Sequence, residues 1–342
     1  MQTSLATPQH AGGQNGQRPK DNSPAVVNRA RRLVLRSFQS PGDIVVLTAA
    51  VRELHRQYPG RFETDVRTSA PAIWEHNPLI TSIADNDPEV RRLDMHYPLI
   101  NQSNQRPVHF LEGYCEFLAS ALELPSLRPR EFRGDIYLSD EERRWMNQVE
   151  QTTGYRDRFW LVNAGSKRDF TCKQWPVESF QAVVDHFRGR VTFVQIGAAE
   201  HSHPPLSGVI DLRGKTDHRQ LIRLMYHAAG VVTGVSYPMH LAAAVPCPPW
   251  MKGLRPCVVV NGGREPAHWE QYPGHQFLHT IGALDCCATG ACWKSRVVPL
   301  GDGDPKDRDL CQQPVAGYPR CMWLIQPDEV IRAVSRHLES RS

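Results

Sequence analysis

The chain has 342 residues, with 40 Lys and Arg against 36 Asp and Glu, and a net charge of +4. That length exceeds one small module and, at roughly 100 to 200 residues per domain, predicts two domains with separate cores. Residues 1–32 hold five basic residues and one acidic residue, so the remainder of the chain is neutral overall. A neutral body lacks the concentrated Lys and Arg of a large nucleic-acid interface, so nucleic acid is not an expected partner.

No segment approaches the roughly 20 consecutive apolar residues of a membrane span, and the N-terminus lacks the apolar core of a secretory signal. We therefore expect a soluble, cytoplasmic protein, with peripheral membrane contact left open. Of nine cysteines, five fall within residues 286–321, and four are scattered, namely Cys115, Cys172, Cys247 and Cys257. In a reducing compartment such a cluster favours metal binding over disulfides.

The N-terminal part of the chain predicts a tail followed by alternating strands and helices. Residues 1–28 are rich in Gln, Asn, Gly, Ser and Pro, a composition typical of disorder. Apolar spacing then predicts a strand over 32–36, a helix over 44–58, a strand over 62–66, and helices beginning at 71, over 110–122 and over 140–151. Residues 85–107 fit no element clearly.

The alternation is clearer in the second half. Strands are predicted over 159–163, 191–196, 210–212, 230–232 and 256–260, and helices over 176–187, 217–229, 239–244 and 327–338. Strands separated by helices of this length indicate an α/β fold with parallel sheets covered on both faces. Because the pattern occurs twice, we expect two Rossmann-like, doubly wound domains, at residues 29–154 and 155–342, facing a cleft. Ligands in such folds bind at the carboxyl ends of the strands.

Several short motifs occur in an order and spacing typical of one family. They are Ser40-Pro-Gly-Asp-Ile-Val-Val-Leu with Tyr58-Pro-Gly, Asn163-Ala-Gly-Ser-Lys, Lys173-Gln-Trp-Pro, Val194-Gln-Ile-Gly with Glu200, Asp211-Leu-Arg-Gly-Lys-Thr, and Gly234 through Ala242. Over residues 32–262 the chain resembles the ADP-heptose heptosyltransferases, glycosyltransferase family 9. The resemblance implies a GT-B architecture, a donor nucleotide sugar bound mainly by the C-terminal domain, and inversion at the anomeric carbon.

Asp43 lies in the loop after the first predicted strand, at the edge where ligands bind. Inverting transfer needs a base for the acceptor hydroxyl, and the resemblance implies that Asp43 is this base. The alternative is that Asp43 caps the helix that follows. No catalytic divalent ion is expected, because fixed positive groups can offset the charge of the leaving diphosphate.

A second group of residues is expected to bind the donor through backbone N–H groups and positive side chains. It comprises Gly165, Ser166, Lys167, Arg168, Lys173, Glu200, Ser236, Met239, His240 and Arg264. Gly165 and Ser166 follow a strand and can bring N–H groups close to a diphosphate, while the basic residues supply charge. The resemblance implies that Lys173 holds phosphate and that Glu200 contacts the donor. The alternative for both is a solvated surface residue.

The segment 234–240 departs from the family. Relatives usually read Asp-Ser/Thr-Gly here, whereas Val235 and Tyr237 stand in place of the Asp and the Gly. Loss of that carboxylate leaves the donor open between ADP-heptose and related nucleotide sugars. Ser236 and a helix N-terminus can still bind phosphate, because they need no carboxylate. His240 has a structural role as its alternative.

Beyond residue 262 the chain diverges from the lipopolysaccharide enzymes. Arg264 could reach a phosphate or pair with Glu265. The loop-rich segment 285–322 contains the clustered cysteines Cys286, Cys287, Cys292, Cys311 and Cys321. Four thiolates suffice for a tetrahedral zinc or iron site, which would stabilise a segment with little apolar content of its own. The segment resembles the metal-bearing cysteine finger of heptosyltransferases that modify autotransporter proteins, and buried, reduced cysteines are the alternative.

The residues and the resemblance together predict an inverting glycosyltransferase that moves a heptose-like sugar from a nucleotide-diphosphate donor to an acceptor hydroxyl. The acceptor stays open between a glycan, a lipid-linked oligosaccharide and a protein. Residues 85–110, including Arg91, Arg92, His96 and His109, are expected to face it. Two other functions are retained: a UDP-sugar epimerase of GT-B fold, and a non-catalytic protein that binds nucleotide sugars or glycans.

Overall fold

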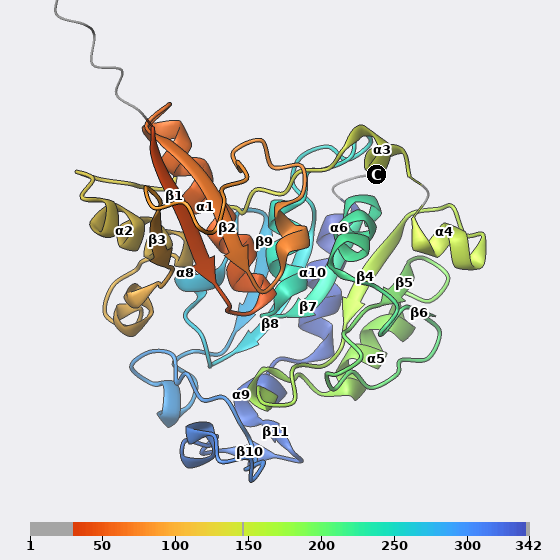
Figure 1. Cartoon of the computed structure of the whole chain (residues 1–342). Coiled ribbons are helices and arrows are strands. Elements are labelled where there is room, and N and C mark those ends of the chain that lie inside the picture. The colour runs from red at the N-terminus through yellow and green to blue at the C-terminus, as the bar shows by residue number, and fades with distance from the viewer. Residues whose placement is uncertain (1–29, 146, 340–342) are drawn as a thin grey trace, which may run out of the picture.

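Figure 1 shows the computed structural model of the chain, which describes residues 30–145 and 147–339. The predicted disordered tail, 1–28, lies outside these residues. Two parallel sheets with surrounding helices form the molecule, so the predicted α/β class is confirmed. Within the described residues, no helix is long and apolar enough to cross a membrane.

The first sheet has three parallel strands in the order β2-β1-β3. They are β1 (Arg31–Ser37), β2 (Phe62–Thr68) and β3 (Arg91–Asp94). The run Leu33, Val34 and Leu35 in the central strand is buried, as its continuous apolar sequence predicts for a strand covered on both faces. The helices of this part are α1 (Pro41–Gln57) and α2 (Phe110–Leu122), with the 3-10 turns η1 (Pro71–Trp74) and η2 (Pro98–Gln102).

The second sheet has six parallel strands in the order β6-β5-β4-β7-β8-β9. They are β4 (Phe159–Asn163), β5 (Thr192–Gln195), β6 (Ile210–Asp211), β7 (Gly230–Gly234), β8 (Cys257–Gly262) and β9 (His275–His279). Every residue of β4, β7 and β8 is buried, which requires cover on both faces of the sheet. The accompanying helices are α5 (Val177–His186), α6 (His218–His227), α7 (Tyr237–Ala244), α8 (Ala267–Glu270) and α10 (Pro327–Glu339).

The structure departs from the predicted elements at four places. The helix expected over 140–151 is two helices, α3 (Asp140–Arg144) and α4 (Gln148–Thr153), because Ser139 and Asn147 each begin a helix by accepting a backbone hydrogen bond. The region 85–107 contains β3 and η2, and the segment after Pro71 forms a short turn in place of a full helix. Strand β9 is absent from the predicted elements because its sequence, His-Gln-Phe-Leu-His, is half polar.

The two sheets meet where α1 packs against α7. Gly42, in the first turn of α1, lies against His240 of α7, and a Cβ at position 42 would stand 2.7 Å from the imidazole Cδ2. Gly134 lies between Val45 and Ala244 in the same way. Because α1 follows the carboxyl end of β1 and α7 follows that of β7, this packing brings the ligand-binding edges of the two sheets together.

The cysteine-rich part of the chain forms an irregular segment below the second sheet in Figure 1. It contains η4 (Asp285–Cys287), η5 (Pro305–Arg308), β10 (Pro314–Val315), β11 (Tyr318–Pro319) and α9 (Arg320–Trp323). Strands β10 and β11 pair with each other and stay apart from the two large sheets. The turn η3 (Thr171–Lys173), which follows β4, contacts β11 and so joins this segment to the second sheet.

Candidate active site

Asp43 occupies the first turn of α1, directly after β1, and its side chain stays partly exposed. Its Oδ1 accepts a hydrogen bond of 2.9 Å from the phenol of Tyr97, and its carboxylate also accepts one from the backbone of Ser40, the N-cap. Burial raises the pKa of Asp43, against the opposing effects of the Tyr97 hydrogen bond and the charge of Lys173. Asp43 therefore supports the helix start and also has the raised basicity that suits a general base.

Lys173 approaches the same region from the second sheet. It ends η3, and its Nζ lies 2.9 Å from Oε1 of Glu265, which Arg264 also binds. Burial would raise the pKa of Glu265, but the charges of Arg264 and Lys173 outweigh it and hold that pKa below the ordinary value. An ammonium group has three donors, so the bond to the ionised Glu265 fixes Lys173 and leaves capacity to bind phosphate.

Four cations surround the ring of Phe170, in the loop between β4 and η3. The Nζ atoms of Lys167, Lys173 and Lys306 and the Cζ atom of Arg264 lie 6.0, 5.7, 5.4 and 5.3 Å from its centroid. Lys173 and Arg264 share Glu265, and Lys306 pairs with Asp304, so three of these cations are partly offset by carboxylates. The shared Glu265 leaves the pair of Lys173 and Arg264 with excess positive charge, which together with Lys167 favours an anionic ligand.

The glycine loop after β4 reaches the start of α1. Gly165 has a φ of 130°, and a Cβ there would collide with the carbonyl oxygen of Ser202, so the position requires glycine. The backbone N–H of Ser166 donates to that carbonyl at 3.0 Å. Nζ of Lys167 donates to Oγ of Ser40 at 3.2 Å. The loop thus lies beside the turn that carries the candidate base.

The start of α7 supplies a hydroxyl and a buried imidazole. Ser236 is the N-cap, and its Oγ accepts from Asn163 at 3.1 Å and lies 3.0 Å from Oγ1 of Thr233. His240 is buried, with Nδ1 2.7 Å from the hydroxyl of Tyr272. Burial lowers the pKa of His240 to about 3, so its ring is neutral near pH 7. Ser236 remains suited to phosphate, whereas His240 packs under Gly42 and supplies no charge.

Other members of the expected donor set have different surroundings. Met239 is fully buried in the core, so it packs and has no surface to offer a donor. Arg264 is buried and donates from Nε to the carbonyl of Lys294 at 2.6 Å, so the alternative of an ion pair with the neighbouring glutamate is the one the structure shows. Arg168 and Glu200 are exposed. The residues that the structure brings together near the candidate base are Gly165, Ser166, Lys167, Lys173 and Ser236.

Tyr97, Glu270 and Tyr272 belong to this region but carry no sequence motif. Glu270 ends α8, and its Oε2 lies 3.7 Å from Nε2 of His240 without a hydrogen-bond partner among the described residues. Burial, followed by the charge of Glu265, raises the pKa of Glu270 well above its ordinary value. The sequence contains no signal for Tyr97 either, because β3, the strand that it follows, was itself not predicted.

Five cysteines line one cavity. Four of them belong to the five that cluster in the sequence, and the fifth comes from elsewhere in the chain. The cavity set is Cys172, Cys286, Cys292, Cys311 and Cys321. Cys172 comes from η3, and Cys287 is not part of the lining. A hydrogen bond from the Cys172 thiol lowers the pKa of Cys311 to about 6. The cavity lining thus differs from the expected ligand set at one cysteine, because the fold brings η3 to the segment that holds the other four.

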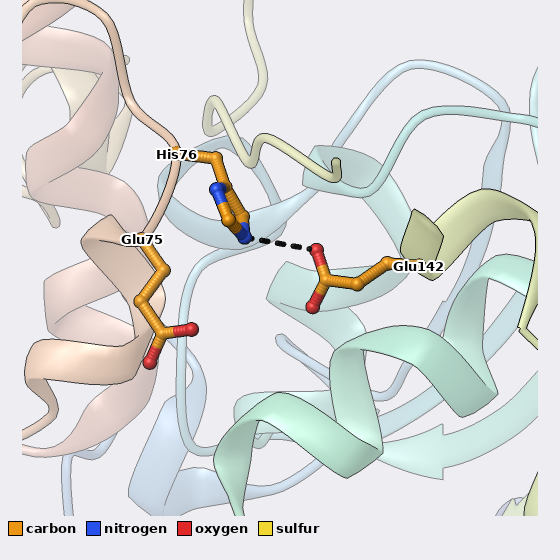
Figure 2. Close-up of side chains that lie close together, drawn as sticks. All are labelled: Glu75, His76 and Glu142. Atoms are coloured by element: carbon orange, nitrogen blue, oxygen red, sulfur yellow. Dashed lines mark ion pairs between the residues drawn. The ribbon is translucent and has the colours of Figure 1, made fainter. Parts of the chain in front are cut away.

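A separate group has its ligand atoms close enough for a metal ion. In Figure 2 the side chains of Glu75, His76 and Glu142 converge, with one ligand atom of each lying within 4.8 Å of the others. Arg219 of α6 pairs with Glu142 at 2.5 Å and lies 3.5 Å from Glu75. Because a guanidinium already neutralises these carboxylates, we interpret the group as an ion-pair network that links the N-terminal part to α6. Among the described residues, no three thiols of the cysteine cavity meet the same spacing.

The residues expected to face an acceptor do not share one surface. Arg91 and Arg92 begin β3, and pair in register with Leu33 and Val34 of β1, so they lie toward the amino ends of the strands and away from the ligand-binding edge. His109 is buried as the N-cap of α2. His96 is exposed just beyond the carboxyl end of β3. The expectation is therefore corrected for the two arginines and His109.

Residues 90–249 match the family model described as glycosyltransferase family 9 (heptosyltransferase). The matched residues include Gly165, Lys173 and Ser236 of the expected donor set. The chain is accordingly a nucleotide-sugar glycosyltransferase, and neither an epimerase nor a non-catalytic binding protein is favoured. Asp43 and the cysteine-rich segment lie outside the matched residues. No curated protein matches the sequence.

Several solved structures resemble this chain over about nine-tenths of its length. A family 9 glycosyl transferase from Veillonella parvula has a TM-score of 0.62 at 15% identity, over 91% of this chain and 97% of that one. ADP-heptose LPS heptosyltransferase II of E. coli has a TM-score of 0.57 at 14% identity, over 90% and 99%. The dodecameric, iron-containing heptosyltransferase TibC of enterotoxigenic E. coli, in complex with ADP-D-beta-D-heptose, has a TM-score of 0.60 at 14% identity, over 92% and 77%. These likenesses establish the GT-B fold.

Proposed function

We propose that the chain transfers a heptose-like sugar from ADP-heptose or a related nucleotide sugar to an acceptor hydroxyl, with inversion at the anomeric carbon. The observation that carries the proposal is Asp43, a carboxylate of raised basicity beside the charge of Lys173 from the other sheet. Similar solved structures are named as heptosyltransferases, and one is in complex with ADP-D-beta-D-heptose. The acceptor is a hydroxyl of a glycan, a lipid-linked oligosaccharide or a protein.

In the proposed step, Asp43 takes the proton of the acceptor hydroxyl. The acceptor oxygen then bonds to the anomeric carbon from the face opposite the diphosphate, and the bond from that carbon to the diphosphate oxygen breaks. Tyr97 holds the carboxylate through its phenol, because its hydrogen bond to Oδ1 fixes the orientation of Asp43.

The leaving diphosphate is held by fixed groups of the second sheet. Lys167 and Lys173 supply charge, the glycine loop supplies the backbone N–H of Gly165, and Ser236 stands at the N-terminus of α7. The N–H of Ser166 already donates to the carbonyl of Ser202 and so holds the shape of the loop. These groups stabilise the charge that develops on the leaving oxygen, so the proposed reaction needs no catalytic divalent ion.

We further propose a structural zinc or iron ion at the cysteine cavity, in a chain located in the cytoplasm. The donor set fits, because both metals accept four thiolates and five thiols face this cavity. All nine cysteines are free thiols in the structure, as the reducing cytoplasm requires. One structure of similar fold is named as iron-containing. The metal would hold the cysteine-rich segment in shape and take no part in sugar transfer.

The base assignment is tested with Asp43→Asn, which keeps the size of the side chain and removes its basicity. We expect sugar transfer from ADP-heptose to fall by about 100-fold or more, the usual contribution of a positioned base. ADP binding, measured by calorimetry, should stay unchanged because Asp43 holds no phosphate. An Asp43→Asn variant that transfers at the wild-type rate would show that another group is the base.

The donor assignment is tested with Lys173→Met, compared with Lys252→Met as a control at an exposed position. A charge-assisted hydrogen bond contributes about 1.5 to 3 kcal/mol, so ADP affinity should fall by about tenfold or more in the first variant and stay unchanged in the second. Equal ADP affinity in the two variants would remove Lys173 from the phosphate site.

A further inference from the structure

The cavity below the second sheet combines thiols from two distant parts of the chain. Cys286, Cys292, Cys311 and Cys321 belong to the cysteine-rich segment. Cys172 belongs to η3, between the glycine loop and the helix α5, and its thiol hydrogen-bonds to Cys311. A buried thiol facing four others in one cavity needs an explanation beyond ordinary packing, because a free cysteine in a core usually contacts apolar groups.

Backbone hydrogen bonds fix Cys172 against this segment. Its N–H donates to the carbonyl of Ser295 at 3.0 Å, and the N–H of Val297 donates to Oγ1 of Thr171 at 2.9 Å. The N–H of Cys311 donates at 2.8 Å to the carbonyl of Arg296, which lies between Ser295 and Val297 in the chain. Cys172 and Cys311 therefore flank the same short stretch of backbone, which holds their side chains toward one cavity.

Cys287 does not line this cavity. Its Sγ lies 3.6 Å from the carbonyl oxygen of Thr280, and it packs so closely under Gly263 that a Cβ at that glycine would stand 3.0 Å from the sulfur. This thiol is buried against the backbone, although the sequence places it beside Cys286.

The cavity also contains positive charge that suits a thiolate site. Arg264 and Lys294 both line it. Arg264 and Lys294 are already paired with Glu265 and Asp309. The exposed Arg320, a third basic residue of the lining, is therefore the one that can offset part of the net charge of −2 that four thiolates carry around a divalent ion.

We propose that Cys172 is a ligand of the metal at this cavity and that Cys287 is not, with the remaining ligands drawn from Cys286, Cys292, Cys311 and Cys321. The assignment rests on the proposed structural metal. Each thiol that binds loses its proton to solvent as its bond to the metal forms, and the metal draws together sulfur atoms that stand farther apart in the structure. Because Cys172 directly precedes Lys173, the metal would also fix the turn that carries the phosphate-binding lysine.

The test compares Cys172→Ser with Cys287→Ser in the full chain, with Cys115→Ser as a control in the core of the N-terminal part. Each protein is stripped of metal, titrated with Co²⁺ under reducing conditions, and followed by the thiolate-to-cobalt charge-transfer absorption. We expect Cys172→Ser to lose about a quarter of this absorption, because one of four thiolates is gone, and to bind Co²⁺ at least about tenfold more weakly. Cys287→Ser and Cys115→Ser should match the wild type.

The reverse pattern, with Cys287→Ser impaired and Cys172→Ser unchanged, would overturn the assignment. A wild-type chain that shows no thiolate-to-cobalt absorption would overturn the metal itself and the assignment with it, while leaving the tests of Asp43 and Lys173 unaffected. If Cys172→Ser fails to fold, alkylation of the wild-type chain, mapped by mass spectrometry, tests the same assignment. Cys172 should be protected in the zinc-loaded chain and react after chelation, and equal reactivity in both states would also overturn the assignment.

Discussion

Tyr97→Phe should move the acidic limb of the pH–rate profile to higher pH. The phenol of Tyr97 donates to Oδ1 of Asp43 at 2.9 Å, and this bond favours the ionised carboxylate. The substitution removes the hydroxyl and keeps the ring, which packs 4.5 Å from Phe110 and 6.3 Å from Trp269 between centroids. The change therefore acts on the pKa of Asp43 with little change in packing.

The size of the effect follows from the energy of the lost bond. A hydrogen bond to a charged group contributes about 1.5 to 3 kcal/mol, and 1.36 kcal/mol corresponds to one pKa unit, so the pKa of Asp43 should rise by about 1 to 2 units. The base must be unprotonated to accept the proton of the acceptor. Activity should therefore be lost at a pH about 1 to 2 units higher than in the wild type as the solution is acidified.

The assay is kcat/KM for sugar transfer across pH, because this parameter reports ionisations of the free enzyme. Tyr114→Phe is a matched control, since its hydroxyl donates to Gln39 at 2.5 Å and makes no hydrogen bond to Asp43. An acidic limb that stays in place in Tyr97→Phe, or that moves equally in both variants, would refute the reasoning that this phenol controls the basicity of Asp43.

Two further predictions concern the contacts between the parts of the molecule. Gly42→Ala would place a Cβ 2.7 Å from a ring carbon of His240. We therefore expect the free energy of unfolding to fall by about 1 to 3 kcal/mol and the Tm to fall by several degrees. An unchanged melting curve would mean that α7 shifts to accommodate the methyl group without cost. Arg219→Met leaves the buried carboxylate of Glu142 without its main partner. The free energy of unfolding, measured with urea, should fall by on the order of 3 kcal/mol. A decrease below about 1 kcal/mol would instead indicate a weak surface ion pair.

The sequence predicts the parts of the fold that rest on continuous apolar runs. Strands β4, β7 and β8 are buried throughout, and each was expected because burial on both faces requires an apolar residue at every position. Strand β9 lies at the edge of its sheet, and three of its five residues are polar, so its sequence lacks the continuous apolar run that marks the buried strands. The region around β3 escaped prediction because its strand has four residues, three of them charged.

The candidate site also contains residues that the sequence predicts and residues that it does not. Residues within a motif, such as Lys173 and the loop at Gly165, are brought near the start of α1, as the motif order implies. Residues that reach the site through tertiary packing carry no local pattern. Cys172 is the clearest case, because its partners lie more than a hundred positions later in the chain and the contact depends on how η3 meets the cysteine-rich segment. Glu270 likewise reaches the imidazole of His240 from α8.

The replacement of the family carboxylate by Val235 has a physical explanation in the packing. Val235 is 3% exposed and belongs to the main hydrophobic core, where an ionised carboxylate without a partner would be strongly unfavourable. The carboxylate that pairs with Lys173 comes instead from the loop after β8, as the ionised Glu265. Negative charge thus reaches the donor side of the site from a different strand, already paired with Lys173.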